Sequence, residues 1–233
     1  MDFRWKRPHG VRVWLLAITI AGVFGSCNGD GEETSSTDAN TDQCEDITEP
    51  VAGESTPVTV TFRNDSASTI YVPSLSECYL KAYNLSADAL PAGYQLGGGG
   101  CGSACSSVLS EDCNLCEGDG ACSETRTTIV LPPGASYEAD GWGGGVSEVR
   151  DIPAECVKFD HCADSCTVAA PAPAGDYTFT VVGRSECTGD GCDCPNPGEV
   201  CTLELDSVFA GDPIEVSVTI AYPTTAGADL VFN

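Results

Sequence analysis

Apolar and polar side chains alternate along several short segments of the chain, and this period of two is typical of strands that bury one face. The clearest segments are residues 58–62, 69–72, 125–131, 176–182 and 214–222. Weaker alternation marks residues 79–85, 93–96, 135–139, 202–209 and 229–232. No segment after residue 26 keeps a helical period for three turns, so the pattern predicts an all-β protein.

The alternation also predicts which side chains face the core. Tyr177, Phe179 and Val181 share one face of their segment, because side chains two residues apart lie on the same side of a strand. In residues 214–222 the apolar side chains at even positions are expected to face inward. Trp142 stands among four glycines and is expected to lie over the edge of the core, with an exposed ligand platform as the alternative.

Turn residues separate the predicted strands. Pro132-Pro133-Gly134 stands between residues 125–131 and 135–139, and this spacing predicts a β-hairpin. Three segments rich in Cys and Gly hold few large apolar side chains and are expected to be disulfide-stapled loop insertions, at residues 97–122, 156–166 and 187–201. Eight or more strands with such loops predict a single antiparallel β-sandwich over residues 56–233.

The amino end of the chain has the layout of a signal peptide. Four bases stand among residues 4–12, and residues 13–24 follow without a charge. A helix that crosses a bilayer needs about 20 apolar residues, so this run is too short for a membrane span. A short apolar run between a basic start and small residues is typical of a secretory signal, which we expect at residues 1–26.

The signal ends in Phe-Gly-Ser-Cys at residues 24–27, which resembles the lipobox of bacterial lipoproteins. The resemblance implies that Cys27 is diacylated and becomes the new amino terminus. The sequence departs from the motif at Phe24, where an aliphatic residue is usual. Several acyl chains on one cysteine suffice for stable anchoring. The alternative is an ordinary signal cut near Gly25 or Ser26, which leaves Cys27 as one more thiol.

Residues 27–55 are expected to form a lipidated, acidic and disordered tether. No large apolar side chain stands between Asn28 and Gln43, so this stretch cannot bury enough surface to fold. A disulfide-bonded Cys44 would mark the end of the freely moving chain. The expected location is the bacterial outer membrane, on its periplasmic face or at the cell surface.

The chain is strongly acidic. Its formal net charge is -25, and the signal holds four of the ten bases, so the mature chain is more acidic still. Such a surface repels phosphate backbones and anionic lipid head groups, which excludes nucleic acid and electrostatic membrane docking. We therefore expect the protein to contact the membrane only through the lipid on Cys27. Binding to an unidentified protein partner remains an open alternative. The charge also keeps an exported protein soluble.

The chain contains 15 cysteines. Without Cys27 an even number remains, as complete pairing in an oxidising compartment requires, and we expect seven disulfides. Their connectivity stays open, with two local pairs favoured: Cys187 with Cys201, and Cys156 with Cys166. The cysteines expected to pair are Cys44, Cys78, Cys101, Cys105, Cys113, Cys116, Cys122, Cys156, Cys162, Cys166, Cys187, Cys192, Cys194 and Cys201.

Residues that could support catalysis are sparse. His161 is the only histidine after the signal, and no Gly-x-Ser-x-Gly elbow accompanies it, so we expect no enzyme activity and no cofactor. A weak calcium site at Asp119, Asp190 and Asp193 stays open as an alternative to solvated loop turns.

Cys113-x-x-Cys116 has the spacing of a zinc knuckle and of a redox pair. Oxidation outside the inner membrane competes with zinc binding and favours disulfides. The flanking acids Glu111, Asp112 and Glu117 would raise the pKa of these thiols, which argues against a redox pair that needs a stabilised thiolate. We therefore expect no metal site here.

Two resemblances add to this interpretation. Residues 131–137 (Leu-Pro-Pro-Gly-Ala-Ser-Tyr), Trp142 and residues 173–178 (Pro-Ala-Gly-Asp-Tyr-Thr) stand in this order. This layout is similar to small immunoglobulin-like domains of the intracellular proteinase inhibitor type, over roughly residues 58–182, and implies an immunoglobulin-like β-sandwich. The lipobox, acidic tether and Cys-rich β domain together resemble the surface lipoproteins of Gram-negative bacteria, which implies location and architecture without an activity.

These observations predict a non-enzymatic, lipid-anchored envelope protein that presents a disulfide-stabilised binding or structural β domain. The alternative is a protease inhibitor or other protein-binding module of the periplasm or cell surface. In an inhibitor, an exposed loop such as Gly189–Val200 would occupy the protease. An enzyme is the least supported class, because no group of residues in the sequence supports one.

Overall fold

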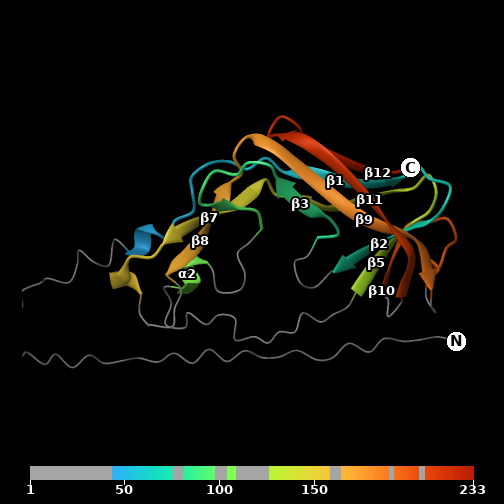
Figure 1. Ribbon diagram of the computed structural model, residues 1–233, viewed down its shortest axis with the longest axis horizontal. Coiled ribbons are helices and arrows are strands. Elements are labelled where there is room, and N and C mark those ends of the chain that lie inside the picture. The colour runs from blue at the N-terminus through green and yellow to red at the C-terminus, as the bar shows by residue number, and fades with distance from the viewer. Residues whose placement is uncertain are drawn as a thin grey trace, which may run out of the picture. The chain divides into compact units, whose positions relative to one another are not determined.

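The computed structural model describes residues 44–75, 81–97, 104–108, 126–157, 164–188, 192–204 and 208–233. Strands dominate these residues and form three sheets (Figure 1). The all-β prediction is confirmed, and most neighbouring strands run antiparallel.

The first sheet has the order β12 (Gly227–Phe232), β1 (Val58–Asn64) and β6 (Ser136–Trp142). β1 runs antiparallel to β6 but parallel to β12. The strand predicted at residues 229–232 is therefore present, yet its pairing departs from the purely antiparallel arrangement that we expected. The reason is that the chain changes sheet after Tyr222, so β12 lies beside the first strand instead of forming a hairpin with the strand before it.

The second sheet has the order β10 (Cys201–Glu204), β5 (Arg126–Leu131), β2 (Ile70–Leu75), β9 (Gly175–Thr188) and β11 (Val208–Tyr222). β3 (Asn84–Ala87) extends this sheet, because it pairs with residues 177–180 of β9 while β2 meets β9 at Arg184. The long pair of β9 and β11 lies along one side of the molecule in Figure 1.

The third sheet consists of β4 (Tyr94–Gln95), β7 (Gly145–Asp151) and β8 (Ser165–Pro171). A short helix, α2 (Cys105–Val108), packs against β8, and a 3-10 turn, η1 (Ala154–Cys156), follows β7. The sequence pattern does not reveal β7 or β8. A glycine start and interspersed charges obscure the alternation of β7, and β8 begins within a segment expected to be a loop.

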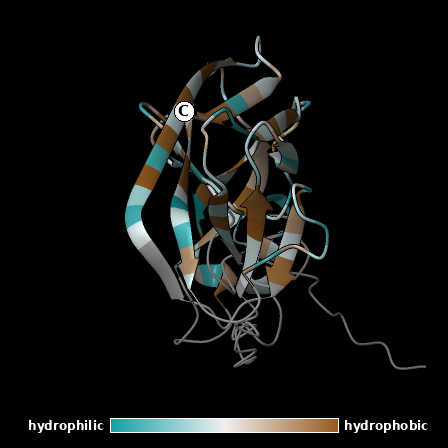
Figure 2. Cartoon of the chain, turned by 90° about the vertical axis from the view of Figure 1, so that its right-hand side faces the viewer, coloured by the Kyte–Doolittle hydropathy of each residue, from teal (hydrophilic) through white to brown (hydrophobic). Residues whose placement is uncertain are grey.

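The main hydrophobic core is built mostly from side chains of the first two sheets, and Val146 of β7 and Ala170 of β8 join it from the third sheet. Tyr177, Phe179 and Val181 are at most 1% exposed, which confirms the shared face predicted for this strand. Phe62 of β1 and Phe232 of β12 contribute from the first sheet and are fully buried. Figure 2 shows the alternation of apolar and polar residues along the strands that this packing requires.

Two strands of the second sheet differ in how well they follow the predicted pattern. In β11 the even-numbered residues from 214 to 222 are buried or half-buried and the odd-numbered ones are exposed, as expected. In β5, alternation would place Thr127, Ile129 and Leu131 on one face of the strand. All five residues from 127 to 131 are buried, so both faces of β5 are covered.

The predicted hairpin between residues 125–131 and 135–139 is wrong. β5 belongs to the second sheet and β6 to the first, so the turn between them carries the chain from one sheet to the other. The last residue of β1, Asn64, pairs with this turn. Its carbonyl accepts from the Gly134 amide at 2.7 Å, and its amide donates to the Ala135 carbonyl at 3.0 Å.

The side chain of Asn64 is fully buried and makes four hydrogen bonds. Its amide nitrogen donates to the carbonyls of Ser68 and Leu131, both at 2.8 Å. Its side-chain oxygen accepts from the Ser66 amide at 3.0 Å and the Ser66 hydroxyl at 2.6 Å. A buried polar group left without partners costs about 1–3 kcal/mol, so this satisfied amide ties β1, the following turn and β5 together.

A smaller apolar cluster lies at the third sheet, and two disulfides cross it. Cys105 of α2 is bonded to Cys166 of β8, 61 residues apart in sequence. Cys44 is bonded to Cys156 of η1, 112 residues apart. The predicted pair of Cys156 with Cys166 is therefore wrong, because η1 meets the start of the domain while β8 meets α2.

The predicted pair of Cys187 with Cys201 is also wrong. Cys187 is bonded to Cys192, and Cys194 to Cys201. The strand that carries Cys201 pairs with β5, whereas the strand that carries Cys187 pairs with β11 and β2. Two strands of the sheet therefore separate these cysteines, although they stand close in sequence.

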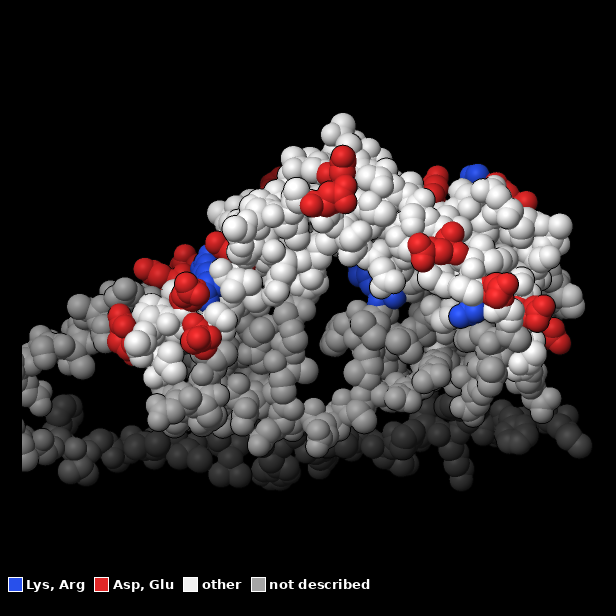
Figure 3. All heavy atoms as spheres, in the orientation of Figure 1, with Lys and Arg blue, Asp and Glu red and all other residues white. Residues whose placement is uncertain are grey.

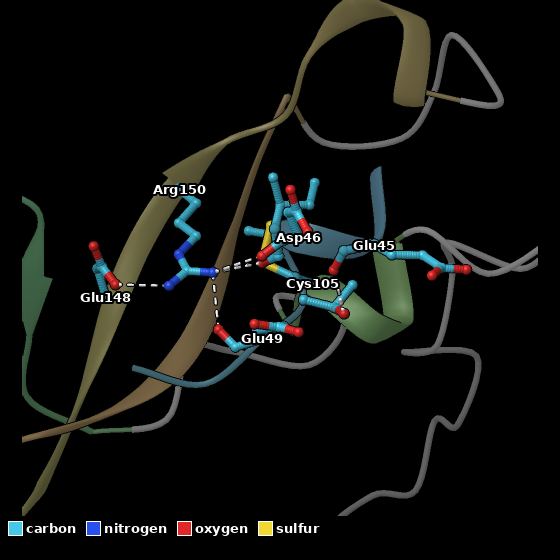
Figure 4. Close-up of a disulfide and its surroundings, with 9 residues drawn as sticks. Glu45, Asp46, Glu49, Cys105, Glu148 and Arg150 are labelled. Atoms are coloured by element: carbon cyan, nitrogen blue, oxygen red, sulfur yellow. Dashed lines mark hydrogen bonds and ion pairs between the residues drawn. A yellow bond between two sulfur atoms is a disulfide. The ribbon is translucent and has the colours of Figure 1, made fainter. Parts of the chain in front are cut away.

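The described end of the predicted tether, residues 44–55, is part of the folded domain. Arg150 of β7 donates from Nη1 to three backbone carbonyls of this segment, those of Asp46, Ile47 and Glu49, at 3.3, 3.1 and 2.8 Å (Figure 4). Its Nη2 donates to the Glu148 carboxylate at 3.2 Å. The domain thus includes residues before position 56, where we expected it to start.

Loss of a disulfide should reduce stability according to the length of chain that it encloses. We expect Cys105→Ala/Cys166→Ala to lower the free energy of unfolding by about 4 kcal/mol and Cys187→Ala/Cys192→Ala by about 2 kcal/mol. The reason is that the first pair spans 61 residues and the second only 5. Denaturant unfolding of both double variants measures the difference. Equal losses, or a larger loss for the short loop, would contradict this expectation.

Candidate functional site

Many residues that the sequence analysis singles out fall outside the described residues. They are His161, the lipidation candidate Cys27, Asp119, Asp190, and six cysteines expected to pair, namely Cys78, Cys101, Cys113, Cys116, Cys122 and Cys162. Each of the eight cysteines within the described residues is disulfide-bonded.

Metal-binding clusters and membrane-spanning helices are both absent from the described part of the chain. Within it, no three His, Cys, Asp or Glu side chains come together where they could hold a metal ion. Asp193, from the alternative calcium site, is exposed. None of the helices in these residues is long and apolar enough to cross a membrane.

A pocket of about 490 Å³ opens between β3 of the second sheet and β7 of the third. This volume lies within the range of small-molecule sites. We call it the Trp142 pocket. The lining side chains that matter most are Lys81, Tyr83, Leu85, Leu96, Trp142 and Val146.

Trp142, the last residue of β6, joins the pocket to the core. Its side chain is 7% exposed, and its ring centroid lies 4.7 Å from that of Tyr177 and 5.0 Å from that of Tyr222. Its indole Nε1 donates to the Gly145 carbonyl at 3.0 Å and closes the turn between β6 and β7. The expected place of Trp142 at the core is confirmed, and the exposed platform is excluded.

The same turn requires a glycine at position 144. Gly144 has a φ of +71°, in the left-handed region that favours glycine. A β-carbon there would also collide with the Thr56 carbonyl and the Tyr222 hydroxyl. This hydroxyl accepts from the Thr56 amide at 2.8 Å and donates to the Gly144 carbonyl at 3.2 Å. The turn therefore holds Trp142 in one position beside the pocket.

Lys81 is the basic group of the pocket. Its ammonium donates to the Tyr83 hydroxyl at 3.0 Å and to the Gly141 carbonyl, and it lies 5.4 Å from the centroid of the Tyr83 ring. Burial lowers the pKa of Lys81, and the nearby Asp140 carboxylate raises it by a smaller amount. Burial and the same carboxylate raise the pKa of Tyr83, so its hydroxyl stays protonated.

A second exposed feature is the loop between β9 and β10, at residues 192–200. Two short-range disulfides, Cys187–Cys192 and Cys194–Cys201, hold its ends. Residues 195–199 are all exposed. A groove of about 580 Å³ is lined by this loop together with residues of β2 and β5. The loop therefore stands out from the sheet while its ends are restrained.

Acidic side chains dominate the charge of the protein. The chain has 35 acids and 10 bases. Figure 3 shows acids spread over the visible face, with few basic side chains among them. A basic side chain in a pocket, as at Lys81, is therefore unusual for this surface.

Comparison with known proteins finds no relative: no protein-family model, no curated protein and no solved structure matches this chain. Its function is therefore inferred from its own residues and contacts.

Sequence patterns alone do not reveal the Trp142 pocket. Lys81 and Tyr83 belong to a weak strand candidate, and the spacing of these two residues is the only local sign that they share a face. Lys81 and Tyr83 line one pocket with Trp142 and Val146 only because β7 lies nearby, and the sequence of β7 shows no clear alternation of apolar and polar residues. Only the packing of separate sheets brings these side chains together.

Lys81 should titrate below its ordinary pKa of 10.5. Reductive ¹³C-methylation and NMR would follow it beside Lys158, the only other lysine after residue 26. We expect Asp140→Asn to lower the pKa of Lys81 further, because the carboxylate that raises it is lost. Glu138→Gln, on the same strand, is the control and should have a smaller effect. A Lys81 that titrates at or above 10.5 would show this expectation to be wrong.

Proposed function

We propose that this protein is an exported, non-enzymatic lipoprotein of the bacterial outer membrane, anchored through lipid on Cys27. Beyond an acidic tether, its β domain presents a disulfide-stabilised surface to a binding partner. The observation that carries the proposal is the state of the cysteines, since all eight within the described residues form disulfides.

Disulfides of this kind support export. They persist in oxidising compartments and are rare in the cytosol. The pairs Cys44–Cys156 and Cys105–Cys166 cross a cluster with few apolar residues, and crosslinks are the usual substitute where a core is small. A domain that depends on them matures after it leaves the cytosol. This supports the interpretation of residues 1–26 as a signal.

The position of Cys27 supports the lipid anchor. Residues 28–43 hold no large apolar side chain, and the folded domain includes Cys44 through its disulfide. A flexible coil of this length spans about 20–25 Å. Such a tether would let the domain stand clear of the lipid head groups and reach a partner.

An immunoglobulin-like sandwich is the finer part of the proposal. The hydroxyl of Tyr177, near the start of β9, donates to the Pro173 carbonyl at 2.9 Å. A tyrosine that bonds back to the backbone a few residues upstream, and a buried core tryptophan, are both typical of immunoglobulin-like domains. Trp142 provides the second feature. Both lie in the region that resembles the proteinase inhibitor type of domain.

The anchor can be tested at Cys27. The wild-type protein is expected to carry a diacylglyceryl group on Cys27 and to fractionate with membranes. Cys27→Ala should abolish the acyl mass, because the sulfur that accepts the lipid is lost. Ser26→Ala keeps a small residue before the cysteine and should behave like wild type. Intact mass spectrometry and membrane fractionation measure both. A secreted chain that starts near Cys27 without acyl groups would refute the anchor and support an ordinary signal.

A second candidate function, protease inhibition, is favoured by the loop at residues 192–200. Its ends are restrained by two disulfides and its residues 195–199 are exposed. A loop restrained in advance loses less conformational entropy on binding, and this increases affinity. An inhibitor needs such a loop to occupy a protease without being cut quickly.

Titration of a set of serine and cysteine proteases tests the inhibitor function. Stoichiometric loss of activity is expected for at least one protease. Cys194→Ala/Cys201→Ala should weaken the inhibition by about tenfold, since the loop loses one restraint. Thr178→Ala/Thr219→Ala removes an exposed hydroxyl pair on β9 and β11 and should inhibit like wild type. Full activity of every protease in excess protein would exclude this function.

A further inference from the structure

The Trp142 pocket combines apolar walls with a single ammonium group. Leu85 of β3, Leu96 after β4 and Val146 of β7 contribute apolar side chains, and Trp142 adds its ring. A volume of about 490 Å³ suits a small organic molecule better than a bare ion. The pocket therefore offers an apolar molecule both space and one charged contact.

Lys81 retains a donor for such a molecule. An ammonium carries three N–H groups, and two of them are directed to the Tyr83 hydroxyl and the Gly141 carbonyl. No third acceptor for Lys81 is found within the described part of the chain. A ligand oxygen could accept the remaining hydrogen bond while the other two hold the ammonium in place.

Asp140 is the acidic residue that acts on the charge of Lys81. Asp140 stands beside Gly141 on β6, and its carboxylate stabilises the ammonium, but burial opposes the charged form more strongly. No ion pair among the described residues includes Lys81. Tyr83, the other titratable group in contact with Lys81, stays neutral. Lys81 is exposed to solvent, so an anionic group of a ligand can reach its ammonium.

The surroundings favour a ligand with a single negative charge. Lys81 is the only basic residue among the described residues that line the pocket. The chain as a whole is acidic, with 35 acids and 10 bases. A phosphate or a dicarboxylate would bring a second negative charge that has no cation to face, whereas one carboxylate matches one ammonium.

We propose that the Trp142 pocket binds a small monocarboxylate with an apolar chain or ring. The carboxylate accepts a hydrogen bond from Lys81, and the apolar body packs against Leu85 and Leu96, the half-buried leucines of the lining. The inference rests on the proposed role as a binding protein and names its ligand class. It does not depend on the lipid at Cys27.

Calorimetric titration of the full-length protein with 3-phenylpropanoate and with hexanoate tests this proposal. The uncharged amides, 3-phenylpropanamide and hexanamide, are the matched ligand controls. At least one carboxylate is expected to bind saturably, one molecule per protein. It should bind about tenfold more tightly than its amide, because hydrogen bonds between charged groups are the stronger ones.

Two variants separate the charged contact from the apolar one. Lys81→Met should reduce the affinity for the carboxylate to that for the amide, while Lys158→Met, which alters the other lysine of the mature chain, should change neither. Asn84 is an exposed residue of the pocket lining. Asn84→Trp should weaken the binding of both carboxylate and amide by filling the space. Thermal melting would confirm that each variant is folded. If Lys81→Met does not fold, Asn84→Trp still tests the pocket.

The proposal is overturned if neither carboxylate binds saturably, if carboxylate and amide bind equally, or if folded Lys81→Met binds like wild type. These results are independent of the mass measured at Cys27. An unacylated protein that binds the carboxylate would refute only the anchor, and an acylated protein that does not bind it would refute only the pocket.

Discussion

The packing of Trp142 connects the three sheets of this protein. Its strand, β6, belongs to the first sheet, its ring lies against Tyr177 of the second, and its indole N–H fixes the turn into β7 of the third. Gly144 allows this turn, because no side chain fits between Thr56 and the Tyr222 hydroxyl. One side chain thus takes part in the core, the turn and the pocket.

At the third sheet, outside the main core, disulfides and hydrogen bonds hold the chain segments together. The third sheet packs over a small apolar cluster, in which three of the five buried residues are disulfide-bonded cysteines. Arg150 adds hydrogen bonds from the same sheet to the backbone of residues 46–49 (Figure 4). Together these contacts hold the start of the domain against its middle. They also make residues 44–49 part of the folded domain.

The two surfaces suited to binding have different physical origins. The Trp142 pocket exists because β3 and β7 belong to different sheets and leave a space between them, which Lys81 makes polar on one side. The loop at residues 192–200 is exposed because two short disulfides restrain it outside the sheet. A pocket of this kind favours a small molecule, whereas a restrained loop favours a protein. One domain could offer both, since they do not share residues.

The sequence by itself determined the strands that bury one face, such as β1, β9 and β11, because alternation is a local consequence of such burial. It also determined the inward face of β9 and the core position of Trp142. It could not determine which strands pair with one another. The turn at residues 132–134 has the composition of a hairpin, yet Asn64 holds it as a crossing between sheets. Disulfide partners and the lining of the pocket were decided only by the tertiary structure, because they depend on which strands become neighbours in space.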